Sequence, residues 1–238
     1  MTLIKPYRSI PIRECGEPLV PIPRGAFAFF DPHPYIEMGA SYGSASPWML
    51  RRSVLESLKE AQQRLHRLKP GWKIKLFDAY RPVAVQTFLV DREFVLQARH
   101  AGLNPARLSE SERERIMDKV FRLFAVPSAA PATPPPHSTG AAFDCTLADE
   151  AGNDVDMGSP IDENSDQSIS DYFADVGNEK ARQAHANRTF LKDLLYVEGM
   201  RRNPNEWWHF SRGDQLAIWI DRDISPQGFA VYGRADLL

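Results

Sequence analysis

Five prolines among the ten residues 127–136 are the strongest single constraint on how this 238-residue chain folds. Proline fixes one backbone angle and lacks an amide hydrogen, so this stretch can form neither a helix interior nor a central strand. It could be a linker between two domains, but it leads directly into His137. We therefore expect a stiff, extended loop that delivers this histidine to a fixed place.

His137 opens the first of two segments whose side chains have the chemistry of a catalytic zinc site. The first segment reads His-Ser-Thr-Gly-Ala-Ala-Phe-Asp and ends at Asp144, and the second, Glu206 to His209, reads Glu-Trp-Trp-His. Two imidazoles and one carboxylate would leave one of four zinc positions open for water, as in catalytic sites. Glu206 would then be free to take a proton from that water. The alternative is an aromatic core strand with an exposed glutamate.

The backbone must bend in both segments for these side chains to meet. Gly140 permits backbone angles closed to other residues, which suits a loop that turns into the strand carrying Asp144. Residues three apart in a regular strand face opposite sides. Glu206 and His209 can therefore share a site only if the chain is still turning at residues 204–206, where Pro and Asn favour a turn.

Hydrophobic periodicity predicts helices and short strands that do not alternate regularly. Helices are expected over about 46–70, 82–102, 109–124 and 179–198. Strands are expected over about 72–76, 141–147, 155–157, 206–210 and 216–220. Residues 1–46 have no sustained period and are expected as an irregular N-terminal segment packed on the core. This mixture favours one α+β domain over residues 1–238 rather than a doubly wound sheet.

Composition restricts the partners and the compartment. The net charge of −2 gives no electrostatic case for nucleic acid or an anionic membrane as a partner. No apolar run reaches the length of a membrane span, and the N-terminal residues lack the apolar core of a secretory signal, which predicts a cytoplasmic location. Two cysteines, Cys15 and Cys145, are too few for a disulfide framework. Cys145 is expected to be a buried structural residue.

Arg81 stands at the end of a predicted strand with one buried face. Its guanidinium is a fixed positive charge with a planar fork of donors. Near a zinc-bound carbonyl it would stabilise the oxyanion of the transition state. The alternative is a salt bridge with Asp78 or another acid, and the residues alone leave these two roles open. His33 lies in a loop between two prolines, and the sequence leaves open whether it is solvated or belongs to the site.

Taken together, these motifs resemble the VanX-type D-alanyl-D-alanine dipeptidases, a group of zinc D,D-peptidases whose fold is shared with the hedgehog signalling domain. Four motifs occur in matching order between about residues 72 and 210. They are Asp-Ala-Tyr-Arg-Pro ending at Pro82, His-x-x-Gly-x-Ala-x-Asp ending at Asp144, Met-Gly-x-x-x-Asp ending at Asp162, and Glu-x-Trp-His ending at His209. The resemblance implies a central, mainly antiparallel sheet with flanking helices.

The resemblance also implies a role for each site residue. One Zn²⁺ per chain would be held by His137, Asp144 and His209. Glu206 would be the general base and acid, and Arg81 would stabilise the transition state. Asp162 would bind the ammonium group of the substrate, which favours free dipeptides over chains extended at that end. The implied partner is a small dipeptide, D-alanyl-D-alanine or a relative, and the implied role is in peptidoglycan turnover.

One position departs from the family pattern. The family usually has a serine two residues before the first histidine, where the hydroxyl helps to hold the substrate. This chain has Pro135 there, which offers neither a hydroxyl nor an N–H. The departure leaves zinc binding intact and bears on which dipeptide is preferred. Two alternatives stay open: a D,D-carboxypeptidase acting on peptidoglycan stem peptides, and a non-catalytic, hedgehog-like zinc-binding module.

Overall fold

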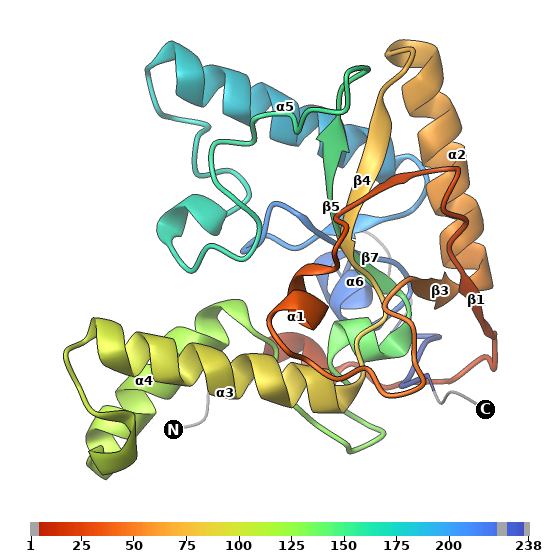
Figure 1. The fold of residues 1–238 in the computed structure, drawn as a ribbon. Helices are drawn as coiled ribbons and strands as arrows, with labels where there is room; N and C mark the ends of the chain where they lie inside the picture. Colours follow the sequence, from red (N-terminus) through yellow and green to blue (C-terminus); the bar gives the residue numbers. More distant parts are fainter. Residues whose placement is uncertain (1–4, 223–227, 236–238) are drawn as a thin grey trace.

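The computed structural model describes residues 5–222 and 228–235, in which helices pack around a mixed five-stranded sheet (Figure 1). The strand order is β2 (Ala28–Phe29), β4 (Lys73–Asp78), β5 (Ala142–Ala148), β7 (His209–Ser211) and β6 (Arg201–Arg202). β2 runs parallel to β4, and the other three neighbouring pairs are antiparallel. The predicted α+β class is therefore confirmed, with a mixed sheet.

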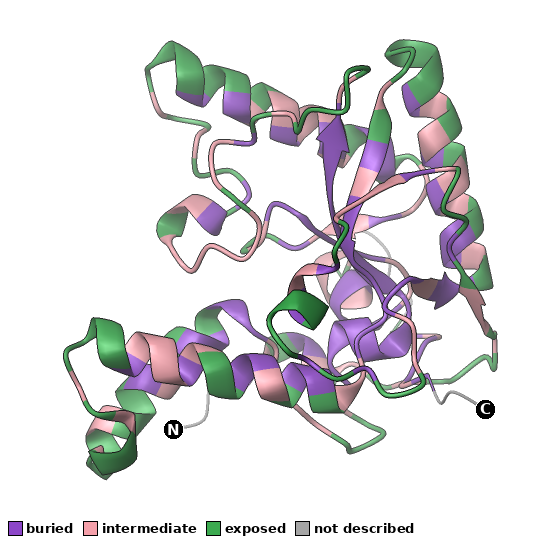
Figure 2. Cartoon of the chain, viewed as in Figure 1, coloured by how far each residue is buried: buried purple, intermediate pink, exposed green. Residues whose placement is uncertain are grey.

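Strand β5 occupies the middle of the sheet, and each of its seven residues is buried (Figure 2). Cys145 and Leu147 belong to the hydrophobic core, as predicted for Cys145. Side chains alternate between the two faces of a strand, so Asp144 points to the face opposite these two residues. A buried carboxylate at the centre of a sheet needs charged or hydrogen-bonding partners, and these partners form the site described below.

Two pairs of helices flank the sheet. α2 (Arg52–Leu68) and α5 (Glu179–Tyr196) contact each other, and they pack on β4 and β6 respectively. α3 (Val83–His100) and α4 (Glu110–Leu123) lie side by side and extend to the lower left in Figure 1. The predicted capping box is present, since the Ser109 and Glu112 side chains satisfy each other's backbone N–H groups. These four helices match the predicted ones except at the start of α2.

The N-terminal segment holds several short elements. They are the 3₁₀ helix η1 (Pro6–Ser9), β1 (Leu19–Pro21), β2 and α1 (Pro34–Glu37). β1 pairs with β3 (Met49–Arg51) in a separate two-stranded sheet. The remaining short elements are η2 (Pro105–Arg107), η3 (Pro136–Thr139), η4 (Asp166–Ser168) and α6 (Gln215–Ile220). Within the described ranges, no helix combines the length and apolar character needed to cross a membrane.

One predicted helix start and one predicted strand are wrong, because local patterns are ambiguous over a few residues. The helix predicted from residue 46 begins at Arg52, because residues 49–51 pair as β3. The strand predicted over 216–220 is the helix α6, in which the Asp214 side chain accepts a hydrogen bond of 2.8 Å from the Ala217 N–H. A short apolar run does not distinguish a strand from a buried helix, and here an N-terminal cap decides for the helix.

The strands predicted over 155–157 and 206–210 are also corrected. The first is reduced to an isolated bridge between Ala148 and Asp154, after a turn held by the Asp149 carboxylate. The second begins only at His209, because residues 204–205 and 207–208 lie in turns. The predicted turn before His209 is therefore present, and it shortens the strand.

Candidate active site

Two carboxylates and one imidazole lie opposite one another on the central strands of the sheet. In the sheet, Asp144 of β5 pairs directly with His209 of β7, and Asp78 at the end of β4 pairs with Asp144. Residues that are opposite each other on adjacent strands project from the same face. Strand pairing alone therefore brings a carboxylate and an imidazole together although they are 65 residues apart in the chain.

His137 reaches this face from η3, which follows the proline-rich stretch. The sequence predicts a loop that turns into a strand here, and the structure instead has one 3₁₀ turn ended by Gly140 in the left-handed region, with φ of 68°. A Cβ at Gly140 would also lie 2.1 Å from Leu19 Cδ2, so the end of the Leu19 side chain would have to move. Gly140 is therefore suited to this turn chiefly by its backbone angles.

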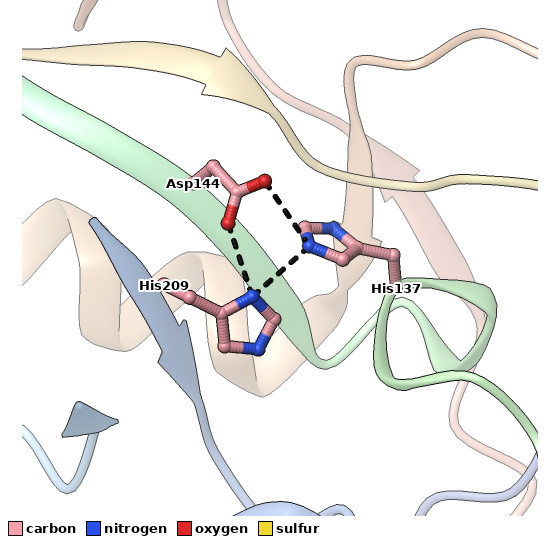
Figure 3. A group of neighbouring side chains, drawn as sticks. All are labelled: His137, Asp144 and His209. Carbon is pink, nitrogen blue, oxygen red and sulfur yellow. Dashed lines mark hydrogen bonds and ion pairs between the residues drawn. The ribbon is translucent and has the colours of Figure 1, made fainter. Parts of the chain in front are cut away.

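The side chains of His137, Asp144 and His209 converge and are all buried (Figure 3). His137 Nε2 lies 3.1 Å from His209 Nδ1 and 3.3 Å from Asp144 Oδ2. His209 Nδ1 lies 3.0 Å from Asp144 Oδ1. Ligands at zinc–nitrogen and zinc–oxygen distances in a tetrahedral site lie roughly 3.3 Å apart. The spacing of the three donors therefore fits one zinc ion.

The hydrogen bonds made by the outer ring nitrogens of His137 and His209 also indicate a metal site. His137 Nδ1 donates to the carbonyl of Ala79 at 2.7 Å, so its Nε2 carries a lone pair. His209 Nε2 lies 3.2 Å from the Ser211 hydroxyl, which in turn donates to Asp214 at 3.0 Å. His209 Nε2 is then the donor, and its Nδ1 carries a lone pair too. Two lone pairs and a carboxylate facing one another call for a cation, as a metal site with oriented histidines does.

The charges of this cluster shift the pKa values of Asp144 and His209, and both shifts favour the charged forms. Burial alone would raise the pKa of Asp144, but the adjacent His137 and His209 outweigh burial and hold this pKa well below its usual range. Burial opposes protonation of His209, yet the hydrogen bond and charge of Asp144 raise the pKa of this imidazole. The pocket therefore keeps the carboxylate ionised and attracts positive charge to the imidazoles, which is what a metal cation would supply.

Glu206 lies at the edge of the cluster, in the turn before His209. Its Oε2 is 3.6 Å from His209 Nδ1, and its side chain is 12% exposed. Burial raises the pKa of Glu206, although the nearby His209 partly offsets this effect. A carboxylate with a raised pKa beside a metal site can both accept and return a proton near neutral pH.

Arg81 makes an extensive set of buried hydrogen bonds at the same face. Its Nε donates to Asp78 at 2.8 Å, and one terminal nitrogen donates to Gln86 at 2.9 Å. The other terminal nitrogen donates to the Tyr35 hydroxyl at 3.0 Å and to Asp144 Oδ2 at 3.2 Å. Four of the five N–H groups of a guanidinium are thus engaged, and one on the nitrogen nearest Gln86 is left for another acceptor. The salt bridge with Asp78 is present, and one N–H group of Arg81 still remains available to a ligand.

Asp162 joins the site through Tyr35. The Tyr35 hydroxyl donates to Asp162 Oδ2 at 2.7 Å and accepts from Arg81. Asp162 has a φ of 65°, in the left-handed region that non-glycine residues seldom occupy. Burial, and next the charge of Asp144, raise the pKa of Asp162 to about 7. The charge of Arg81 and the hydrogen bond from Tyr35 only partly offset this rise, and a ligand cation would favour the ionised carboxylate further.

All six predicted site residues line one small cavity of about 90 Å³. They are Arg81, His137, Asp144, Asp162, Glu206 and His209. Apolar side chains complete the wall, including Leu123 of α4, Phe124 directly after it, and Trp219 of α6. The structure thus brings together every residue that the sequence suggested for the site.

Comparison with known proteins places the chain in a family. A family model described as D-ala-D-ala dipeptidase, of the peptidase M15 group, matches residues 29–228. The chain belongs to this dipeptidase family. A protein of Synechocystis sp. (strain ATCC 27184 / PCC 6803 / Kazusa) named D-alanyl-D-alanine dipeptidase is 44% identical over 243 residues, covering 99% of this chain and 98% of the relative.

Two further comparisons are more partial. A D-alanyl-D-alanine dipeptidase of Escherichia coli (strain K12) is 39% identical over 74 residues, which is 31% of this dipeptidase-family chain and 36% of the relative. Among solved structures, the LD-carboxypeptidase LdcB is similar with a TM-score of 0.44 and 16% identity, over 89% of this chain and 74% of that one. The D,D-pentapeptidase VanY, in a zinc complex, has a TM-score of 0.43 and 15% identity, over 88% of this chain and 90% of that one.

Several residues of the site carry no signal in the sequence of this family member. His33 is buried and accepts from the Tyr35 N–H, so its other ring nitrogen donates to Asp78 at 3.0 Å. Tyr42 donates to the same carboxylate oxygen at 3.0 Å. Ser211 orients His209 from behind. Local spacing does not indicate the contacts of His33 and Tyr42 with Asp78, because they join distant parts of the chain, whereas Ser211 is only two residues from His209.

Proposed function

We propose that this chain is a zinc-dependent dipeptidase that hydrolyses the peptide bond of D-alanyl-D-alanine or a closely related dipeptide, in the turnover of cell-wall peptides. The observation that carries the proposal is the convergence of three buried donor groups with Glu206, Arg81 and Asp162 on one cavity. The names of the family and of the 44% identical relative support the substrate class.

One Zn²⁺ would be held by His137, Asp144 and His209. When bound, the ion polarises the scissile carbonyl and lowers the pKa of a water molecule beside it. The ring orientations that suit this role come from the hydrogen bonds of the outer nitrogens to Ala79 and Ser211.

Glu206 accepts the proton of the attacking water and returns it to the nitrogen of the departing D-alanine. Its raised pKa suits both directions of transfer. Arg81 donates its remaining N–H to the oxygen that gains negative charge in the transition state. Removing one such donor commonly costs about 2.7–4 kcal/mol of transition-state stabilisation. The Asp78 carboxylate holds the guanidinium in place for this contact.

Asp162 binds the ammonium group of the dipeptide. Pairing with that cation favours the ionised carboxylate, which burial disfavours in the free protein. This pairing argues against a carboxypeptidase acting on long stem peptides. A non-catalytic zinc module has no use for a buried glutamate and arginine beside the metal.

The test is cleavage of three substrates by the zinc-loaded protein: D-Ala-D-Ala, L-Ala-L-Ala and N-acetyl-D-Ala-D-Ala. We expect kcat/KM for D-Ala-D-Ala to exceed that of the acetylated peptide by at least about 100-fold, because acetylation removes the charge that Asp162 pairs with. Equal rates on the free and acetylated peptides would instead support the carboxypeptidase. No cleavage of any of the three would support the binding module.

A further inference from the structure

The N-terminal segment contributes a lysine to the wall of the catalytic cavity. Lys5 and Tyr7 line the cavity together with Glu206 and His209. Tyr7 is buried in η1, and Lys5 is half-buried. The segment has no periodic sequence pattern that would place it there, so its position results from tertiary contacts.

Three sets of contacts hold this segment in place. The buried Gln215 of α6 donates to the carbonyl of Ile10 at 2.6 Å and to that of Ala132 at 3.0 Å. Arg8 donates to the carbonyl of Thr133 at 3.1 Å, in the proline-rich stretch. Further along, Arg13 N–H donates to the carbonyl of Ala230 at 2.8 Å. Lys5 is therefore presented by an anchored piece of chain.

Lys5 is also the available cation of the cavity. Among the described residues that line it, Lys5 and Arg81 are the two with a permanent positive charge. Arg81 is engaged with Asp78, Gln86, Tyr35 and Asp144. Across the described ranges, by contrast, the Lys5 ammonium has no hydrogen-bond or ion-pair partner. Burial lowers the pKa of Lys5, and the charge of Glu206 only partly offsets this. A partly desolvated, unpaired ammonium is favourable only if a ligand anion meets it.

Asp162 and Lys5 belong to different parts of the cavity wall. Asp162 contacts Tyr35, which also accepts from Arg81, whereas Lys5 belongs to the N-terminal segment that lines the cavity together with Glu206. The cavity thus offers a ligand one anionic and one cationic group besides the groups proposed for the chemistry. A dipeptide zwitterion has the matching charges, an ammonium and a carboxylate.

We propose that Lys5 is a specificity-determining residue that binds the C-terminal carboxylate of the dipeptide, an inference that rests on the function proposed above. The role fits the departure at residue 135, where this chain has Pro135 and so lacks a hydroxyl. Lys5 would supply from the N-terminal segment a contact to the substrate that the segment before His137 does not offer. The protein would then select substrates with both termini free.

The test compares D-Ala-D-Ala with its C-terminal amide, D-Ala-D-Ala-NH₂, which lacks the carboxylate. For the zinc-loaded wild-type protein we expect kcat/KM to be about 10- to 100-fold higher for the free acid, as for a charge-assisted contact. Lys5→Met should raise KM for the free acid by a similar factor and bring the ratio close to one. Lys5→Arg should restore most of the preference. Lys180→Met, at an exposed position on α5, is the matched control and should leave the ratio unchanged.

Each other outcome is decisive. A wild-type preference that Lys5→Met leaves intact overturns the inference and leaves the proposed function standing. An equal loss of kcat on both substrates, with a shifted pH profile, would assign Lys5 to Glu206 instead and also overturns it. A wild-type protein inactive on both substrates contradicts the proposed function and the inference with it. Measurements of the zinc content and of the urea unfolding midpoint test whether Lys5→Met is folded. If it is not, Lys5→Gln takes its place in the comparison.

Discussion

The two sides of the proposed catalytic cavity are built in different ways. The side with the proposed metal ligands, the metal side, consists of two short segments, residues 136–144 and 203–211. Asp144 and His209 lie on adjacent strands in direct register, and His137 lies in η3. The other side is the N-terminal segment, which contributes Lys5 to the cavity wall and the Tyr35 hydroxyl that contacts Asp162 and Arg81. The first side is dense in local motifs, and the second has none.

The difference follows from what each side must do. A metal ion needs donors of a few residue types at fixed distances, so neighbouring positions in the sequence are restricted. A substrate wall needs charges of the correct sign at the correct place, and any part of the chain can supply them. Chemistry at the metal should therefore depend steeply on the motif residues. Substrate preference should depend on the N-terminal segment.

The largest expected effect is on the metal side. Glu206→Gln should lower kcat for D-Ala-D-Ala by roughly 10²- to 10⁴-fold, since it removes the general base, and it should retain zinc. His209→Ala should lose both zinc and activity, because two ligands remain. Metal analysis after dialysis, with about one zinc per chain expected for the intact protein, separates the two variants.

Glu179→Gln, at an exposed position at the start of α5, is the control and should match the wild type in kcat and zinc content. An intact protein that holds no zinc would refute the metal centre. Full activity in Glu206→Gln would mean that another group is the base.

The next effect is a roughly fivefold change in substrate affinity with pH. It tests whether Tyr35, from the N-terminal segment, influences Asp162. The pKa of its carboxyl is raised to about 7, so the ionised form that binds an ammonium is lost as the pH falls below 7. In the inactive Glu206→Gln background, calorimetry should find D-Ala-D-Ala binding roughly fivefold weaker at pH 6 than at pH 7. The hydrogen bond from Tyr35 lowers this pKa, so adding Tyr35→Phe should move the binding curve to higher pH.

Adding Asp162→Asn instead should give weak binding with no such pH dependence. Superimposable curves with and without the Tyr35 hydroxyl would show that the N-terminal segment does not tune Asp162. The comparison between the two sides would then hold for Lys5 alone.

The smallest effect concerns how the N-terminal segment is fastened to the core. The Glu17 carboxylate accepts from the Ser53 hydroxyl at 2.8 Å and from the Tyr232 hydroxyl at 2.5 Å. Burial would raise the pKa of Glu17, but the hydrogen bonds from Tyr232 and Ser53 outweigh burial and lower it. Glu17→Gln should therefore reduce the free energy of unfolding by about 1 kcal/mol at pH 7. Urea titrations at several pH values measure this difference.

The sign of the pH dependence follows from the lowered pKa. The stabilisation is complete above the ordinary pKa of a glutamate and is lost as the pH falls through the lower pKa of the folded state. Wild type and Glu17→Gln should therefore converge in acid. A difference that grows toward low pH would contradict the assignment, and kcat on D-Ala-D-Ala should be unaffected throughout.

The sequence predicted the long elements better than the short ones. Helices α3, α4 and α5 follow from several turns of apolar spacing with caps, so many residues agree on one answer. The run at 216–220 has only a few apolar residues, and the Asp214 cap and the packing of α6 on η1 decided its form. The start of α2 was misplaced for a related reason, because pairing of β3 with β1 is a contact between distant residues.

The donor types, their spacing and the need for a turn before His209 were determined by the sequence alone, because metal chemistry restricts local residue types. Tertiary structure decided that Asp144 and His209 face each other in register, that the Ala79 carbonyl orients the His137 imidazole, and that Tyr35 bridges Asp162 and Arg81. It also decided that Lys5 returns to the cavity. These are contacts between distant parts of the chain, which packing and buried hydrogen bonds select and which no local pattern records.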